Sequence, residues 1–211
     1  LAAVRAKTYY DTIDFQPGSP PLIISEPVEE DVVAMEQDIK KAKTQADAVI
    51  MFIHWGIRWL PKIVATYQPP IAHAAIDAGV DLIIGHHSHV PKAVEVYKGK
   101  VCFYSIGNFM TTGSGPRVPT EWNLYWYQVE QDSLYHFPIH CKQTILPKIT
   151  ITKQGVARVA FLPAYINKLA QPEILTSQNP RFQEVVQYLE WVSDYTPHKF
   201  RVEGDEVVVE T

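Results

Sequence analysis

The sequence predicts an α/β fold within one domain over residues 1–211, and two observations indicate it. Two helical stretches each lead into a short apolar run of strand length, and each run is followed by histidine. The 211 residues are 46% hydrophobic and 20% charged, a composition typical of a folded protein that is long enough to bury a core.

The first helix and strand are expected within residues 28–54. Residues 28–46 carry apolar side chains three and four positions apart, with acidic residues first and lysines last, as the helix dipole favours. Residues 48–53 are continuously apolar, like a strand covered on both faces, and His54 follows them. Residues 1–27, which are punctuated by proline, are expected to be irregular.

The second unit repeats this order. Residues 68–78 predict a helix that Gly79 ends, and residues 81–84 predict a buried strand. Because right-handed crossovers bring such strands side by side, 48–53 and 81–84 should be neighbours that end at the same edge of a sheet. Residues 92–97 and 101–105 then predict a hairpin.

The remaining residues predict mainly strands. A helix is expected over residues 180–193, where apolar side chains have helical spacing. Strands are expected at residues 125–129, 140–152, 156–162, 199–202 and 206–209.

Charge and cysteine content exclude several classes of protein. The net charge of -4 gives no basic footprint for nucleic acid. No apolar run approaches the roughly 18–20 residues that a spanning helix needs, so no membrane segment is expected; the compartment, cytoplasm or cell envelope, and the oligomeric state are left open. Cys102 and Cys141 cannot form a disulfide framework, and Cys102 is expected to be an unreactive core thiol.

Four of the eight histidines directly follow the two buried strands and predict a metal site. They are His54, His86, His87 and His89. Ligands collect beyond the carboxyl ends of strands in α/β sheets, and neutral imidazole is a common metal ligand. Three imidazoles within four residues have no packing explanation. By contrast, the isolated histidines His73, His136, His140 and His198 are interpreted as structural.

Within this cluster, His54, His87 and His89 are the expected metal ligands. If the segment after the second strand is extended, His87 and His89 project to one side and His86 to the other. His86 would then support the ligands by hydrogen bonding. Gly56 and Gly85 are interpreted as residues that permit the tight backbone turns at the two strand ends.

Three motifs follow one another at a characteristic spacing. They are His54-Trp55-Gly56, residues 74–90 with Gly85-His86-His87-Ser88-His89, and residues 103–109 with Ser105-Ile106-Gly107-Asn108-Phe109. In their order and spacing they resemble the CapA family, named for poly-γ-glutamate capsule synthesis and similar to the calcineurin-like metallophosphatases. The resemblance is strong over residues 47–109 and weaker at 161–167. It implies a two-sheet sandwich flanked by helices, with two divalent metal ions at one edge and His54, His87 and His89 among the ligands.

The sequence departs from that superfamily in its earlier motifs. It contains neither an Asp-x-His nor an Asn-His pair, which supply further ligands and the acid in the superfamily pattern. The chain is therefore interpreted as the C-terminal part of a family member, truncated at its N-terminus. Alone, it is expected to bind metal weakly and to be nearly inactive.

Two residues are candidates for substrate binding, and each has an alternative role. Arg58 stands where the family often has an acidic residue; it either pairs with a phosphate or carboxylate or is a solvated loop residue. Asn108 either faces the site or caps the strand exit. An aromatic cluster either lines the substrate site or packs elsewhere: Trp122, Tyr125, Trp126 and Tyr127.

Three functions remain in competition. The resemblance favours a metal-dependent hydrolase that cleaves a phosphoester or a γ-glutamyl amide in an anionic small molecule or polymer. An alternative is a mononuclear zinc hydrolase with His54, His87 and His89 as ligands. A third is a capsule-assembly component without catalysis, which binds polymer or partner proteins.

Overall fold

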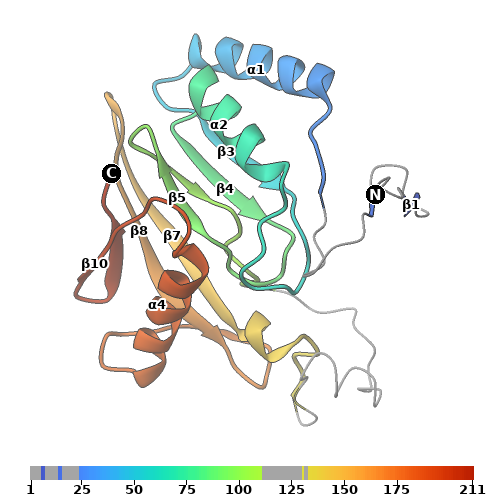
Figure 1. Cartoon of the computed structure of the whole chain (residues 1–211). Helices are drawn as coiled ribbons and strands as arrows, with labels where there is room; N and C mark the ends of the chain where they lie inside the picture. The colour runs from blue at the N-terminus through green and yellow to red at the C-terminus, as the bar shows by residue number, and fades with distance from the viewer. Residues whose placement is uncertain (1–5, 8–13, 16–23, 111–129, 131–132) are drawn as a thin grey trace.

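Two larger β-sheets and three α-helices organise the residues described by this computed structural model, namely 6–7, 14–15, 24–110, 130 and 133–211 (Figure 1). The N-terminal stretch predicted to be irregular contains an antiparallel pair, β1 (Ala6–Lys7) and β2 (Asp14–Phe15). The strand predicted at 125–129 and the aromatic cluster at 122–127 lie outside the described residues.

The first sheet contains four strands in the order β3-β4-β6-β5. β3 (Ile50–His54) and β4 (Leu82–His86) are parallel and in register from their first residues to their last, which confirms the predicted neighbours. β6 (Lys100–Phe103) is parallel to β4 and antiparallel to β5 (Val94–Tyr97), which confirms the hairpin.

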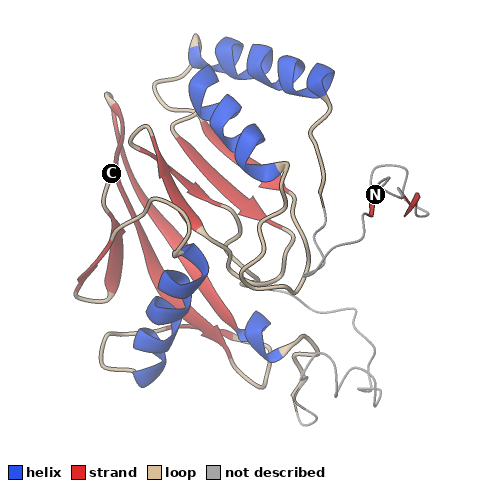
Figure 2. Ribbon diagram, in the orientation of Figure 1, coloured by secondary structure: helices blue, strands red, loops and turns tan. Residues whose placement is uncertain are grey.

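Helices α1 (Glu29–Lys43) and α2 (Gln68–Ala78) cover one face of this sheet (Figure 2). α2 has the predicted bounds, and α1 ends before the predicted residue 46. Ala72 and Ala75 of α2 pack with Ile83 of β4 and Cys102 of β6 in one buried cluster. Small side chains on α2 thus let the helix lie close to the sheet.

The second sheet is antiparallel, with the order β10-β11-β8-β7 and with β9 paired to β8. The predicted helix 180–193 is α4 (Pro180–Ser193). A short 3-10 helix (Ile139–Lys142) occupies the start of the predicted strand 140–152. The strands are β7 (Gln143–Thr152), β8 (Gly155–Ile166), β9 (Pro172–Ile174), β10 (Phe200–Glu203) and β11 (Glu206–Val209).

The two sheets share a core on the side of the first sheet that faces away from α1 and α2. Leu82 and Ile84 of β4 point into it, whereas Ile83 points toward α2, so β4 is buried on both faces. Phe103 and Phe161 meet edge to face across the sheets, with ring centroids 6.4 Å apart. α4 completes this core, and the mixed α/β class is confirmed. The single domain stays a prediction.

Candidate functional site

The parallel register of β3 and β4 brings the predicted histidines together. His54 and His86 are the last residues of their strands and are register partners. Their Nδ1 atoms lie 3.0 Å apart. The ring centroid of His87 is 4.2 Å from that of His54 and 6.2 Å from that of His89. The prediction that His54 lies close to the 86–89 cluster is therefore confirmed.

The segment after β4 is a turn, which corrects the reasoning that separated His86 from its neighbours. His87 has a φ of 102° and His89 a φ of 62°, so the backbone is left-handed where an extended strand was expected. His86 still belongs to β4 and faces His54, its register partner on β3, instead of pointing away. Which of these histidines would hold a metal stays a prediction.

The two glycines next to these histidines are needed for different reasons. Gly56 has a φ of 92°, the left-handed backbone that the sequence led us to expect. Gly85 has ordinary strand backbone, which corrects the expectation, and it is glycine for lack of space. A Cβ there would overlap the carbonyl oxygen of Tyr104 and the indole nitrogen of Trp55.

The surroundings of His86 and His87 favour their neutral imidazole forms. Burial lowers the pKa of His86, and the adjacent His54 ring lowers it further. Burial also lowers the pKa of His87, with further contributions from His54 and then from the guanidinium of Arg58. Neutral imidazole is the form that binds metal ions.

The histidines fit part of a metal site. The ring centroids of His54 and His87 lie 4.2 Å apart, so expected ligands from both strand ends are close enough to contribute to one divalent ion. However, within the described ranges no three His, Cys, Asp or Glu side chains are arranged so that they could hold an ion. A complete metal site is thus not shown.

The loop after β3 carries the substrate candidate Arg58 next to this cluster. The backbone N–H of Trp59 donates to the carbonyl of Ser88 at 2.9 Å, which ties the loop to the turn of His87 and His89. The Arg58 side chain is exposed, and its guanidinium carbon lies 5.9 Å from the centroid of the Trp59 ring. Its role in substrate binding stays a prediction.

Asn108 contacts the cluster through its amide oxygen. His89 Nδ1 lies 2.9 Å from Asn108 Oδ1, and Asn108 Nδ2 donates to the hydroxyl of Tyr135 at 2.6 Å. Substrate binding by Asn108 stays a prediction. Tyr135 carries no motif around it, so nothing in the sequence points to this residue.

Lys92 is a second residue that the sequence analysis missed. Its side chain is buried, and its ammonium donates to the backbone carbonyls of Leu60 and, at 2.6 Å, Ile63. Lys92 therefore anchors the loop after β3 from its buried side. A lysine three residues after the last histidine of a motif gives no sequence signal for this role.

Two of the isolated histidines and both cysteines have structural surroundings. His73 Nε2 lies 2.9 Å from Glu95 Oε1, and His198 Nε2 lies 3.0 Å from Glu190 Oε2. Cys102 and Cys141 are buried free thiols, and burial raises the pKa of each. Cys102 is thus the unreactive core residue that was expected.

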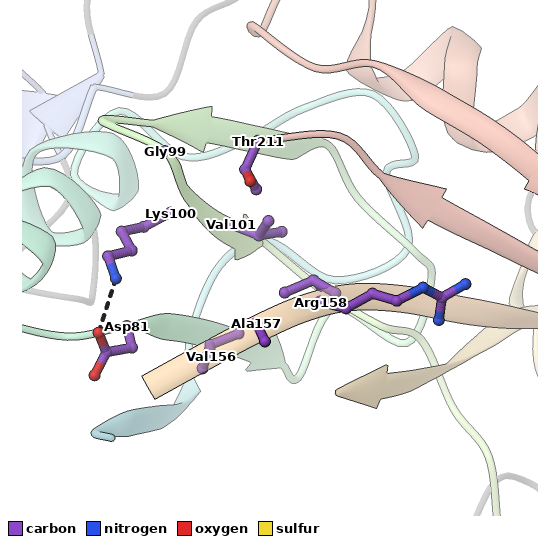
Figure 3. A pocket seen from close by; sticks show the side chains of 9 residues that line it. Asp81, Gly99, Lys100, Val101, Val156, Ala157, Arg158 and Thr211 are labelled. Atoms are coloured by element: carbon purple, nitrogen blue, oxygen red, sulfur yellow. Dashed lines mark hydrogen bonds and ion pairs between the residues drawn. The ribbon is translucent and has the colours of Figure 1, made fainter. Parts of the chain in front are cut away.

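A small pocket lies at the opposite end of the first sheet, near the start of β4 and β6 (Figure 3). Its cationic side chains are already paired: Lys100 with Asp81 at 2.8 Å, and Arg158 with Glu206 at 2.7 Å and Glu203 at 2.9 Å. These ion pairs explain the charges around the pocket without a bound ligand.

The fold and the histidine cluster thus define an α/β protein with a candidate metal-binding edge, and sequence comparison places it in a family. The family described as bacterial capsule synthesis protein PGA_cap matches residues 5–112. This chain belongs to that family.

Three curated relatives share part of the sequence. The chain is 46% identical over 137 residues to the "PGA biosynthesis protein CapA" of Bacillus subtilis, covering 65% of this chain and 32% of the relative. It is 40% identical over 95 residues to the "Capsule biosynthesis protein CapA" of Bacillus anthracis, covering 45% and 22%. It is 33% identical over 94 residues to a "Probable polyglutamine synthesis accessory protein" of Mycobacterium tuberculosis, covering 44% and 24%. The matched part is thus about a third or less of each relative's length.

None of the helices in the described part of the chain is both long enough and apolar enough to cross a membrane.

Proposed function

We propose that this chain supplies the histidine side of a metal-dependent hydrolase that acts in capsule or poly-γ-glutamate synthesis. The observation that carries this proposal is the position of His54 and of the 86–89 cluster at the carboxyl ends of two adjacent parallel strands. Such ends are where α/β proteins bind ligands, and imidazole suits divalent metal ions.

The residues would have separate roles at this edge. His54, His87 and His89 would each contribute a ligand, together with groups from the rest of the protein, and His86 would fix the His54 ring through their Nδ1 contact. Arg58, exposed beside the cluster, pairs with an anionic substrate. A bound divalent ion would activate a water molecule and stabilise negative charge on the oxygen under attack.

The substrate class and the number of metal ions belong to the same proposal. Two relatives are named for capsule or PGA biosynthesis, which supports an anionic polymer, or a small precursor of it, as substrate. The bond cleaved is a phosphoester or a γ-glutamyl amide. Two metal ions are proposed for the whole protein, with the further ligands contributed by the part of its length that this chain does not span.

Calorimetric titration with Zn²⁺ and Mn²⁺ tests the metal proposal. Single substitutions of His54, His87 and His89 by Ala should each weaken binding at least about tenfold, and His86→Ala should weaken it less. His140→Ala is the matched control because His140 is an exposed histidine outside the cluster. Equal affinity of all five variants would contradict the proposal and favour a polymer-binding component without metal.

Turnover distinguishes the proposal from its mononuclear alternative. The 211-residue chain should hydrolyse phosphomonoesters and phosphodiesters weakly, because its histidines provide no carboxylate to bridge two ions. Robust metal-dependent turnover with one ion per chain would instead support the three-histidine zinc site. The assay needs the metal content measured on the same sample.

A further inference from the structure

A chain of hydrogen bonds leads from His89 into the protein interior. His89 Nδ1 lies 2.9 Å from Asn108 Oδ1, Asn108 Nδ2 donates to Tyr135 Oη at 2.6 Å, and Tyr135 Oη donates to the backbone carbonyl of Cys141 at 2.8 Å. The four groups come from the turn after β4, the loop after β6 and residues 135–141. This relay, meaning the chain of hydrogen bonds from His89 to the Cys141 carbonyl, thus connects three separate segments of the protein to one imidazole.

The direction of this relay is determined at its inner end. A backbone carbonyl can only accept a hydrogen bond, so the single hydroxyl proton of Tyr135 must point to Cys141. The hydroxyl oxygen is then an acceptor toward Asn108, and the amide group must present its Nδ2 there. Asn108 Oδ1 consequently faces His89, and because this oxygen is an acceptor only, His89 Nδ1 must carry a proton.

The reversed amide orientation is unfavourable. With Asn108 Oδ1 facing Tyr135, one hydroxyl proton would have to serve two oxygens, the amide and the Cys141 carbonyl. One buried acceptor would then lose its partner, which costs about 1–3 kcal/mol. The amide orientation therefore follows from the network and is not an arbitrary assignment.

We propose that Tyr135, acting through Asn108, is a positioning residue that holds His89 as the tautomer with its proton on Nδ1 and its lone pair on Nε2. This makes Nε2 the His89 atom that can bind a divalent cation or accept a proton from a substrate. The inference deepens the proposed function, since it rests on His89 as a ligand of that site. A metal-ligating histidine commonly has its other nitrogen fixed in this way.

The surroundings of Tyr135 suit this role. Its side chain is 2% exposed and packs with Val90, Cys141 and Ile166 in a small core separate from the two larger ones. Phe137 packs against two members of the hydrogen-bond chain, with its ring centroid 5.0 Å from that of Tyr135 and 5.1 Å from that of His89. Burial raises the pKa of Tyr135 far above neutrality, so the hydroxyl keeps its proton.

Histidine ¹⁵N NMR of the metal-free 211-residue chain at pH 8 tests the tautomer directly. The His89 signals are identified by their loss in His89→Ala. The unsubstituted chain should show the shift of an unprotonated nitrogen at Nε2 and of a protonated one at Nδ1. In Tyr135→Phe, Asn108 can turn over, and a mixture of the two tautomers is expected.

Two further variants separate positioning from a general effect on folding. Tyr188→Phe is the matched control: its hydroxyl is also buried and donates to a backbone carbonyl, that of Pro91, at 3.0 Å, without contacting Asn108. It should leave the His89 tautomer unchanged. The double variant Tyr135→Phe with Asn108→Asp should restore the Nδ1–H tautomer, since both oxygens of a carboxylate accept.

The outcomes distinguish this inference from the proposed function. A proton on Nε2 in the unsubstituted chain, or an unchanged tautomer in folded Tyr135→Phe, would overturn the inference even if Zn²⁺ binds. The predicted tautomer together with no Zn²⁺ binding would overturn the proposed function and leave the inference standing. If both the tautomer inference and the proposed metal binding are correct, Tyr135→Phe should weaken Zn²⁺ binding about 10-fold or more.

Discussion

Replacing Gly85 by Ala tests how the two strands that carry the histidines are packed. The indole Nε1 of Trp55 donates to the carbonyl of Tyr104 at 2.9 Å, and this bond passes directly over Gly85. Trp55 also stacks on the Tyr104 ring, with centroids 5.7 Å apart. A Cβ at position 85 would overlap both atoms of the hydrogen bond, and neither the backbone carbonyl nor the buried indole can move away freely.

The expected loss of stability has two parts. Forcing a methyl group into a packed interior costs about 1–3 kcal/mol. Separating Trp55 from Tyr104 leaves a buried donor and acceptor without partners, which costs about 1–3 kcal/mol. We expect the free energy of unfolding to fall by about 3 kcal/mol or more for Gly85→Ala. For a chain of this size, that corresponds to a melting temperature lower by about 6–12 °C.

Urea unfolding followed by circular dichroism measures this loss, and Gly204→Ala is the informative control. Gly204 has a φ of 61° and no atom within 4 Å of an added Cβ, so its substitution costs only left-handed backbone strain, about 1–2 kcal/mol. Gly85 has the opposite combination, ordinary backbone and no space. If Gly85→Ala loses less stability than Gly204→Ala, the steric explanation of Gly85 is refuted.

Three further predictions concern stability measured by urea or thermal unfolding. Burial lowers the pKa of Lys92 from 10.5 to about 7, so the unfolded chain binds more protons between these values and the free energy of unfolding rises with pH. From pH 7 to 8.5 the unsubstituted chain should gain up to about 2 kcal/mol relative to Lys92→Met. The same dependence of unfolding free energy on pH in both proteins would contradict this. Asp81→Asn leaves Lys43 and Lys100 facing a neutral amide and should cost about 3 kcal/mol; an unchanged melting temperature would show that the pairs contribute nothing. Phe161→Ala opens the core between the sheets and should cost about 3–5 kcal/mol, whereas a loss below about 1 kcal/mol would mean that the sheets do not depend on this contact.

The helices could be predicted from the sequence because local signals and tertiary packing agree there. α4 begins at Pro180, whose missing N–H has no cost in the first turn, and the side chain of Asn179 accepts from the backbone N–H of Arg181. Most of its apolar side chains, among them Phe182, Val185 and Leu189, are buried in the core, whereas Trp191 is about half exposed. The local sequence is thus sufficient to predict both where this helix begins and which of its faces is buried.

The strands of the second sheet were harder to delimit, because their ends depend on pairing. β8 was expected to end at residue 162, but it continues through Pro163 to Ile166, where β9 pairs with it. The carbonyl of Pro163 accepts from the backbone N–H of Leu175 at 2.9 Å. A three-residue strand such as β9 has too little periodicity to be recognised before its partner is known.

The sequence predicted where the candidate site lies but not how its side chains are arranged. Strand order and the apolar runs placed His54 and His86 at one edge, since parallel register follows from the crossover connection. The left-handed turn at His87 and His89 could not be read from the sequence, because non-glycine residues rarely adopt such backbone. Tyr135 escaped notice because its part in the site depends on its contact with Asn108, which is 27 residues away in the sequence.

The four histidines are consequently held by two different kinds of structure. His54 and His86 are fixed by the ladder between β3 and β4, whose hydrogen bonds continue to the bond between the Trp55 N–H and the His86 carbonyl at 3.0 Å. His87 and His89 lie in a turn whose backbone costs about 1–3 kcal/mol at each left-handed residue, and that turn persists only while tertiary contacts hold it. Weakening those contacts should therefore displace His87 and His89 while the His54–His86 pair keeps its spacing.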